Sequence, residues 1–113
     1  MRLYLAAVLA LVPLMAQPPQ RPAPKNLKLL KAEEIRPMMG AFRAALGVQC
    51  TACHVQGDFA SDENPKKEMA RKMITMTREI NSHFPDGKMH VTCYTCHRGA
   101  TEPATAPPPA AAQ

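Results

Sequence analysis

The sequence contains very little of the aromatic material from which small domains usually build an interior. It has no tryptophan, two tyrosines and three phenylalanines in 113 residues. One of these aromatics, Tyr4, lies in an N-terminal apolar run and not in the part that we expect to fold. A small domain with so thin a core usually depends on disulfides, a metal or a bound cofactor. We therefore expect a large apolar group to complete the interior.

The sequence also lacks the features of a nucleic-acid-binding protein. Its formal net charge is +5, but its lysines and arginines form no basic cluster interleaved with aromatic residues. The charge is typical of a solvated basic surface, and we expect no nucleic-acid partner.

The N-terminus has the layout of a secretory signal peptide. Arg2 precedes an apolar run over residues 3–15, and after Ala16 the sequence becomes polar and proline-rich. The run is short for a bilayer span, so we expect residues 1–16 to be cleaved, with an uncleaved anchor as the alternative. No cysteine follows the run, which argues against a lipoprotein. We expect an exported protein, periplasmic or extracellular.

Two proline-rich segments flank the part that can fold. Residues 17–26 are polar and rich in proline, and residues 101–113 are rich in proline and alanine with a single charge. Neither segment can bury a core, so we predict a linker and a disordered tail. Residues 27–100 remain as one small domain.

All four cysteines lie in two short sequences, GVQCTACH at 47–54 and VTCYTCHRG at 91–99. C-x-x-C-H is the attachment signature of c-type haem. Two cysteines three apart on one helical turn face the same way and can bond to two vinyl groups along one porphyrin edge. The histidine that follows is placed to bind the iron. We predict two haem c groups, with Cys50, Cys53, Cys93 and Cys96 as covalent attachments and His54 and His97 as proximal iron ligands.

A four-cysteine zinc site and redox-active disulfides are the alternatives. The two pairs lie farther apart than the roughly 15–20 residues usual in a zinc ribbon. Zinc gives no reason for a histidine directly after both pairs, and export favours oxidation of free thiols. Two disulfides with trailing histidines are also harder to explain than haem.

The periodicity of the apolar residues predicts a mainly α fold with little or no sheet. The first helix is expected over 33–46, with Pro37 near its first turn and Gly47 beyond its end. The second is expected over 65–81, with Asn64 as its N-cap. Each helix carries methionines and precedes one of the two C-x-x-C-H sequences.

An iron that only carries electrons normally has a second protein ligand. The candidates are Met38, Met39, Met69, Met73, Met76, Met89, His83 and His90. A methionine stripe at helical spacing is more often part of a core, and loop histidines usually face water. The residues alone do not decide between Met38 and Met39, or between Met73 and Met76.

Three stretches carry a more specific resemblance: MGAFRAALGVQCTACH, FASDENPKKEMARKMITMTREIN and VTCYTCHRG. Together they resemble one two-haem half of the cytochrome c subunit of photosynthetic reaction centres, and equally its small dihaem relatives in non-photosynthetic bacteria. The resemblance implies that each helix gives a methionine to the haem of the C-x-x-C-H sequence that follows it. By position, Met39 would serve the Cys50/Cys53 haem and Met73 the Cys93/Cys96 haem. The tetrahaem subunit has four such sequences and this chain has two.

The function that follows is a dihaem electron carrier and not an enzyme. It would pass single electrons between redox protein partners through two six-coordinate His/Met haems, in association with a membrane electron-transfer complex if the resemblance extends so far. The alternatives are a haem enzyme or sensor with one open iron position, and a subunit of a multihaem assembly.

Overall fold

A computed structural model describes residues 18–110 and shows a mainly helical chain without strands in that range. Its one β feature there is an isolated antiparallel bridge between Val55 and Asp58. The elements are η1 (Ala32–Glu34), α1 (Ile35–Leu46), η2 (Cys50–Ala52), α2 (Lys66–Ser82) and α3 (Cys93–His97). The mainly α prediction is confirmed. The expected signal peptide lies outside the described residues.

Helix α1 ends where the sequence predicts and starts two residues later. Residues 32–34 form the 3-10 turn η1, and the α-helix begins at Ile35. At its other end, Gly47 takes a left-handed conformation with φ +66°, and its N–H donates to the Arg43 carbonyl at 2.9 Å. Glycine adopts this conformation without steric cost, which explains why the helix stops there.

Helix α2 begins within one residue of the expected position because Asn64 organises its N-terminus. The Asn64 side-chain oxygen accepts a hydrogen bond from the Lys66 backbone N–H at 3.0 Å, which satisfies one of the free donors of the first turn. The Asn64 side-chain nitrogen donates to the Ala52 carbonyl at 3.1 Å. The N-cap position itself is Pro65, so Asn64 acts from one residue before the expected place and attaches the start of α2 to the first C-x-x-C-H sequence.

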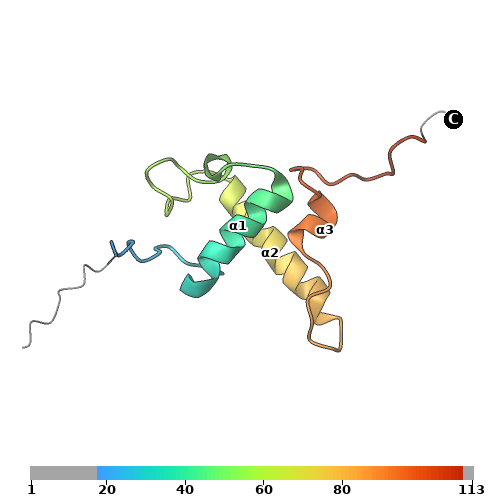
Figure 1. Ribbon diagram of the computed structural model, residues 1–113, viewed down its shortest axis with the longest axis horizontal. Coiled ribbons are helices and arrows are strands. Elements are labelled where there is room, and N and C mark those ends of the chain that lie inside the picture. The colour runs from blue at the N-terminus through green and yellow to red at the C-terminus, as the bar shows by residue number, and fades with distance from the viewer. Residues whose placement is uncertain (1–17, 111–113) are drawn as a thin grey trace, which may run out of the picture.

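Figure 1 shows α1 and α2 as the two long helices, with the short α3 next to them and the two ends of the described chain leaving on opposite sides. Helix α3 contacts both α1 and α2. Arg78 of α2 links the N-terminal part of the domain to that helix, with an ion pair to Glu34 at 3.3 Å and a hydrogen bond to the Leu29 carbonyl at 3.4 Å.

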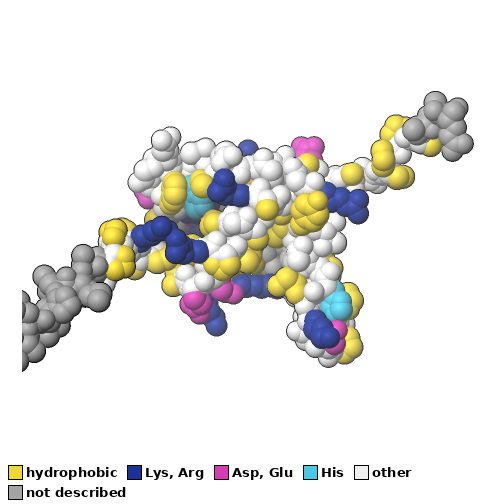
Figure 2. All heavy atoms as spheres, in the orientation of Figure 1, with side chains coloured by type: hydrophobic (Ala, Val, Ile, Leu, Met, Phe, Trp, Pro, Cys, Tyr) yellow, Lys and Arg dark blue, Asp and Glu magenta, His cyan; other side chains and the backbone are white. Residues whose placement is uncertain are grey.

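The protein supplies only a small core of its own. Among the described residues, Ala45 and Ile74 are the buried hydrophobic ones, and a fully buried isoleucine is worth roughly 1.5–3 kcal/mol. Figure 2 shows apolar side chains lying open across the middle of the face in view. The large exposed apolar residues are Leu27, Phe59, Met69, Met76, Ile80, Phe84, Met89 and Tyr94. Apolar surface of this extent suits packing against a large apolar group.

The segments at the two ends contain no regular structure. Residues 18–25 and 101–110 are exposed and form neither helix nor strand. Within the part of the chain that the structure describes, no helix combines the length and apolar character needed to cross a membrane.

Candidate functional site

The second C-x-x-C-H sequence forms a single turn of α-helix, as the cysteine spacing predicts. Helix α3 runs from Cys93 to His97, and the Thr92 backbone N–H before it donates to the Thr95 hydroxyl at 2.9 Å. Arg98 ends the helix in a left-handed conformation with φ 51°. Cysteines at the first and fourth positions of such a turn lie on one side of it, as attachment to a single porphyrin edge requires.

The first C-x-x-C-H sequence has a different backbone from the expected α-helical turn. Residues 50–52 form the 3-10 helix η2, and Cys53 lies just beyond it. The His54 N–H still donates to the Cys50 carbonyl at 3.0 Å, so the segment closes one turn before it opens into the loop of residues 55–63. A tight 3-10 turn is common where a helical segment is only a few residues long.

The two histidines are held in the same way despite this difference. His54 Nδ1 lies 2.9 Å from the Phe59 carbonyl oxygen, and His97 Nδ1 lies 2.9 Å from that of Ala100. A carbonyl oxygen can only accept, so the hydrogen of each neutral ring is on Nδ1. This leaves the lone pair of Nε2 available, which is the state of a histidine that binds a metal through Nε2.

The four thiols are free, and their exposure differs. Cys50 and Cys96 are exposed, whereas Cys53 and Cys93 are half-buried. Burial raises the pKa of the Cys93 thiol above its ordinary value.

The zinc alternative does not match the arrangement of the donors. Within residues 18–110, no group of three or more His, Cys, Asp or Glu side chains is arranged to hold a metal ion. The two cysteine pairs therefore do not converge on one centre. In the sequence each cysteine pair is followed directly by its own histidine, His54 or His97.

The residues after the second C-x-x-C-H sequence contact the end of α1, just before the first. The Gly99 N–H donates to the Ala45 carbonyl at 2.8 Å, which fastens the end of α3 to the end of α1. A Cβ atom on Gly47 would overlap the Gly99 carbonyl. Glycine at position 47 is therefore required both for its positive φ and for this close approach.

The candidate methionines differ in how far they are buried. Met38, Met39 and Met73 are half-buried, whereas the exposed fractions of Met69, Met76 and Met89 are 53%, 45% and 75%. This favours Met73 over Met76 as the partly enclosed methionine of α2 and leaves Met38 and Met39 equivalent. The assignment of iron ligands to Met39 and Met73 stays a prediction.

The loop histidines have other partners or face water. His90 Nε2 lies 2.9 Å from each carboxylate oxygen of Asp86, and its ring stacks on Phe84 with centroids 4.1 Å apart. His83 is exposed. Both positions agree with the expectation that loop histidines lie at the surface.

Sequence reasoning missed Asn81, which holds the segment that leads into the second C-x-x-C-H sequence, called the second site below. Its side-chain oxygen accepts the N–H groups of His90 and Val91 at 2.8 and 2.9 Å, and its side-chain nitrogen donates to the Val91 carbonyl at 2.7 Å. One amide thereby replaces the backbone pairing that this extended segment lacks. The only signal in the sequence was an asparagine at the end of the α2 pattern.

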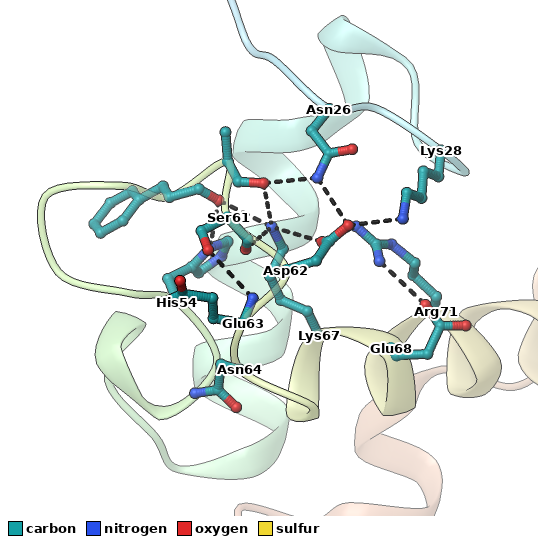
Figure 3. A network of polar contacts seen from close by, with 12 residues as sticks. Asn26, Lys28, His54, Ser61, Asp62, Glu63, Asn64, Lys67, Glu68 and Arg71 are labelled. Atoms are coloured by element: carbon teal, nitrogen blue, oxygen red, sulfur yellow. Dashed lines mark hydrogen bonds and ion pairs between the residues drawn. The ribbon is translucent and has the colours of Figure 1, made fainter.

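Sequence reasoning also missed a polar network beside the first C-x-x-C-H sequence, called the first site below, which Figure 3 shows. Asp62 lies at its centre and pairs with Lys28 at 2.7 Å, Arg71 at 2.7 Å and Lys67 at 3.2 Å. These cations hold the pKa of Asp62 far below its usual range, and the hydrogen bond from Lys28 makes the largest contribution. The network fixes the loop of residues 55–63 against the first turn of α2.

Comparison with known proteins places these features in a family. The sequence model described as "Photosynthetic reaction centre cytochrome C subunit" matches residues 23–107. Three relatives are cytochrome c-554 of Chloroflexus aurantiacus and the photosynthetic reaction center cytochrome c subunits of Thermochromatium tepidum and Rubrivivax gelatinosus. No solved structure matches the chain.

These matches cover much of the chain but little of each relative. The identities are 44% over 61 residues, 46% over 59 and 33% over 90, in the order given. They cover 50%, 48% and 65% of this chain, and 15%, 14% and 25% of the respective relatives. The chain thus spans a quarter or less of the length of these proteins.

Proposed function

The chain belongs to the photosynthetic reaction centre cytochrome c subunit family, and from this membership we propose that it is a dihaem c-type cytochrome that carries single electrons. In this proposal it binds two haem c groups, one at each C-x-x-C-H sequence, and turns over no substrate. When bound, haem supplies a one-electron couple, because its iron changes between two oxidation states.

The matching geometry of the two histidines carries the proposal. In each segment a pair of thiols stands directly before an imidazole whose Nδ1–H donates to a backbone carbonyl. That hydrogen bond fixes the ring orientation and directs Nε2 outward as a ligand. Two separate donor sets of the same kind support two attached groups.

The remaining residues also fit haem. Eight large apolar side chains are exposed around the helices, and they offer contact area for two flat apolar rings. We propose Met39 as the second ligand at the first site and Met73 at the second. Their positions in the family pattern support both, and the partial burial of Met73 supports the second further.

We also propose export and a redox protein as partner. The signal-peptide layout of residues 1–16 supports a location beyond the inner membrane, periplasmic or extracellular. The relatives are named as subunits of photosynthetic reaction centres, which supports a partner in a membrane electron-transfer complex.

An optical spectrum of the exported protein, oxidised and then reduced, tests the proposal. Sharp c-type bands on reduction, two haems per chain and a weak red Met–iron band in the oxidised form are expected. Met39→Ala and Met73→Ala should each remove roughly half of the red band, because each variant takes one of two thioether ligands. Met89→Ala is the matched control, since Met89 is 75% exposed and should leave the band unchanged.

Two results would contradict the proposal in different ways. A high-spin spectrum that shifts with carbon monoxide would mean an open iron position, and the protein would be a haem enzyme or sensor. A colourless protein would refute haem attachment altogether.

A further inference from the structure

The Phe59 carbonyl accepts hydrogen bonds from two side chains at once. His54 Nδ1 donates to it at 2.9 Å and Lys67 Nζ donates to it at 3.1 Å. Because both bonds meet on one oxygen, the ammonium nitrogen lies within about 6 Å of the imidazole Nδ1, close enough for a substantial electrostatic effect. The histidine comes from the first site and the lysine from the first turn of α2 (Figure 3).

Lys67 is fixed in this position by four oxygen atoms. Besides the Phe59 carbonyl, its Nζ donates to the carbonyls of Ala60 and Ser61 at 3.1 and 2.6 Å, and pairs with Asp62 at 3.2 Å. Only 13% of the Lys67 side chain is exposed. A charge held so firmly and so little exposed is screened much less than a surface lysine.

Asp62 cancels this charge only in part. Its carboxylate is shared among Lys28, Lys67 and Arg71, and its shorter contacts are those with Lys28 and Arg71. Glu68 pairs with Arg71 at 3.1 Å. In these ion pairs three cations share two carboxylates, so the charge of Lys67 is only partly neutralised.

Both consequences of this arrangement act in one direction. A carbonyl already polarised by an ammonium group accepts less strongly from a second donor, so the imidazole keeps its proton more fully and is a weaker electron donor at Nε2. The positive charge also disfavours the more positive, oxidised iron. Each effect raises the reduction potential at the first site.

The second site lacks this feature. His97 Nδ1 donates to the Ala100 carbonyl at 2.9 Å, and no other side chain in residues 18–110 makes a hydrogen bond to that oxygen. Arg98 follows His97 directly, but it is exposed, so solvent screens its charge. With the same ligand set at both irons, the two sites would still differ.

We propose that Lys67 is a positioning residue that acts through the Phe59 carbonyl on His54 and sets the first site at a higher reduction potential than the second. The inference rests on the proposed dihaem function and adds the order in which the two haems are reduced. The first electron to arrive settles at the Cys50/Cys53 haem, and the Cys93/Cys96 haem is the last reduced and the first oxidised.

A redox titration of the haem-loaded protein, followed optically, tests this order. Lys67→Gln removes the charge and keeps an N–H donor. It should lower the higher-potential step by roughly tenfold in its reduction equilibrium, about 59 mV for a one-electron couple, and leave the lower step unchanged. Lys67→Arg should keep the potential near that of the wild type. Lys66→Gln is the matched control, because Lys66 is the exposed neighbour on the same helix and should move neither step.

Asp62→Asn separates electrostatics from loosening of the loop. It removes the carboxylate that partly neutralises Lys67, so the higher step should rise. If the contacts of Lys67 only held the loop in place, Asp62→Asn and Lys67→Gln would shift the reduction potential in the same direction. If Lys67→Gln does not accumulate with both haems, the sign of the Asp62→Asn shift decides alone: a rise supports the proposal, and a fall or no shift overturns it.

Other outcomes separate this inference from the function on which it rests. A shift confined to the lower step, an unmoved higher step in Lys67→Gln, or an equal shift in Lys66→Gln would overturn the role of Lys67 in a protein that still carries two haems. A wild-type protein without two haems would refute the proposed function itself.

Discussion

Replacing Gly47 with alanine should cost more stability than the same change at any other glycine of the domain. Gly47 ends α1 with φ +66°, a conformation that costs a residue with a side chain about 1–2 kcal/mol. The new Cβ would also overlap the Gly99 carbonyl, which belongs to backbone and not to a flexible side chain. Relief of this overlap requires the ends of α1 and α3 to separate.

Separation of the ends of α1 and α3 accounts for the rest of the loss of stability. It would stretch the hydrogen bond from the Gly99 N–H to the Ala45 carbonyl, now 2.8 Å, which is worth about 0.5–1.5 kcal/mol. Together with the conformational strain, Gly47→Ala should lower the free energy of unfolding by about 2.5 kcal/mol. Urea unfolding of the haem-loaded protein, followed by circular dichroism, measures the loss.

Two other glycines provide matched controls. Gly57 has φ +84° but open space around its Cβ position, so Gly57→Ala should show only the strain, about 1–2 kcal/mol. Gly40 lies inside α1 with nothing within 4 Å, so Gly40→Ala should stabilise by roughly 0.5–1 kcal/mol. A Gly47→Ala variant no less stable than Gly57→Ala would refute the argument from close approach.

Three further predictions concern the polar contacts. The Lys28 hydrogen bond and the other cations hold the pKa of Asp62 below its unfolded value. The stabilisation of the fold by the Asp62 carboxylate is therefore complete above about pH 4 and is lost as pH falls below that. A difference in unfolding midpoint between wild type and Asp62→Asn that stays constant down to about pH 2 would contradict this. Asn81→Ala should cost about 2 kcal/mol in urea unfolding, because it removes three hydrogen bonds before the second C-x-x-C-H sequence, two of them half-buried. A loss below about 0.5 kcal/mol would count against that role. Arg78→Gln should cost less than about 1 kcal/mol and less still in high salt, since its pair with Glu34 is exposed, and a larger loss would mean that the pair is not screened.

The helices and their ends could be predicted because the signals are local. Gly47 stops α1, and Asn64 with Pro65 starts α2, so the expected ranges 33–46 and 65–81 differ from the structure by no more than two residues. The two C-x-x-C-H sequences were equally visible. Their backbones were not, because the choice between the α-helical turn of α3 and the 3-10 turn η2 depends on flanking contacts.

The partners of the two histidines could not be predicted. The acceptors are backbone carbonyls of Phe59 and Ala100, and a carbonyl leaves no mark in a sequence. Lys67 reaches its four oxygens only because residues 55–63 fold back over the start of α2. In the sequence it is one lysine of a KK pair, with nothing to distinguish it from Lys66.

Helix α2 sets the distance between the two C-x-x-C-H segments, because a side chain near each of its ends binds a segment next to one of them. Lys67 holds the first site at one end, and Asn81 holds the approach to the second at the other. Asn81 follows Lys67 by fourteen residues, which is nearly four turns and about 21 Å, so both side chains lie on one side of the helix. Deleting one residue would rotate one side chain by about 100° relative to the other. The length of this helix can therefore change over evolution only by whole turns, and a change of one turn would move the two C-x-x-C-H segments apart or together by about 5.4 Å.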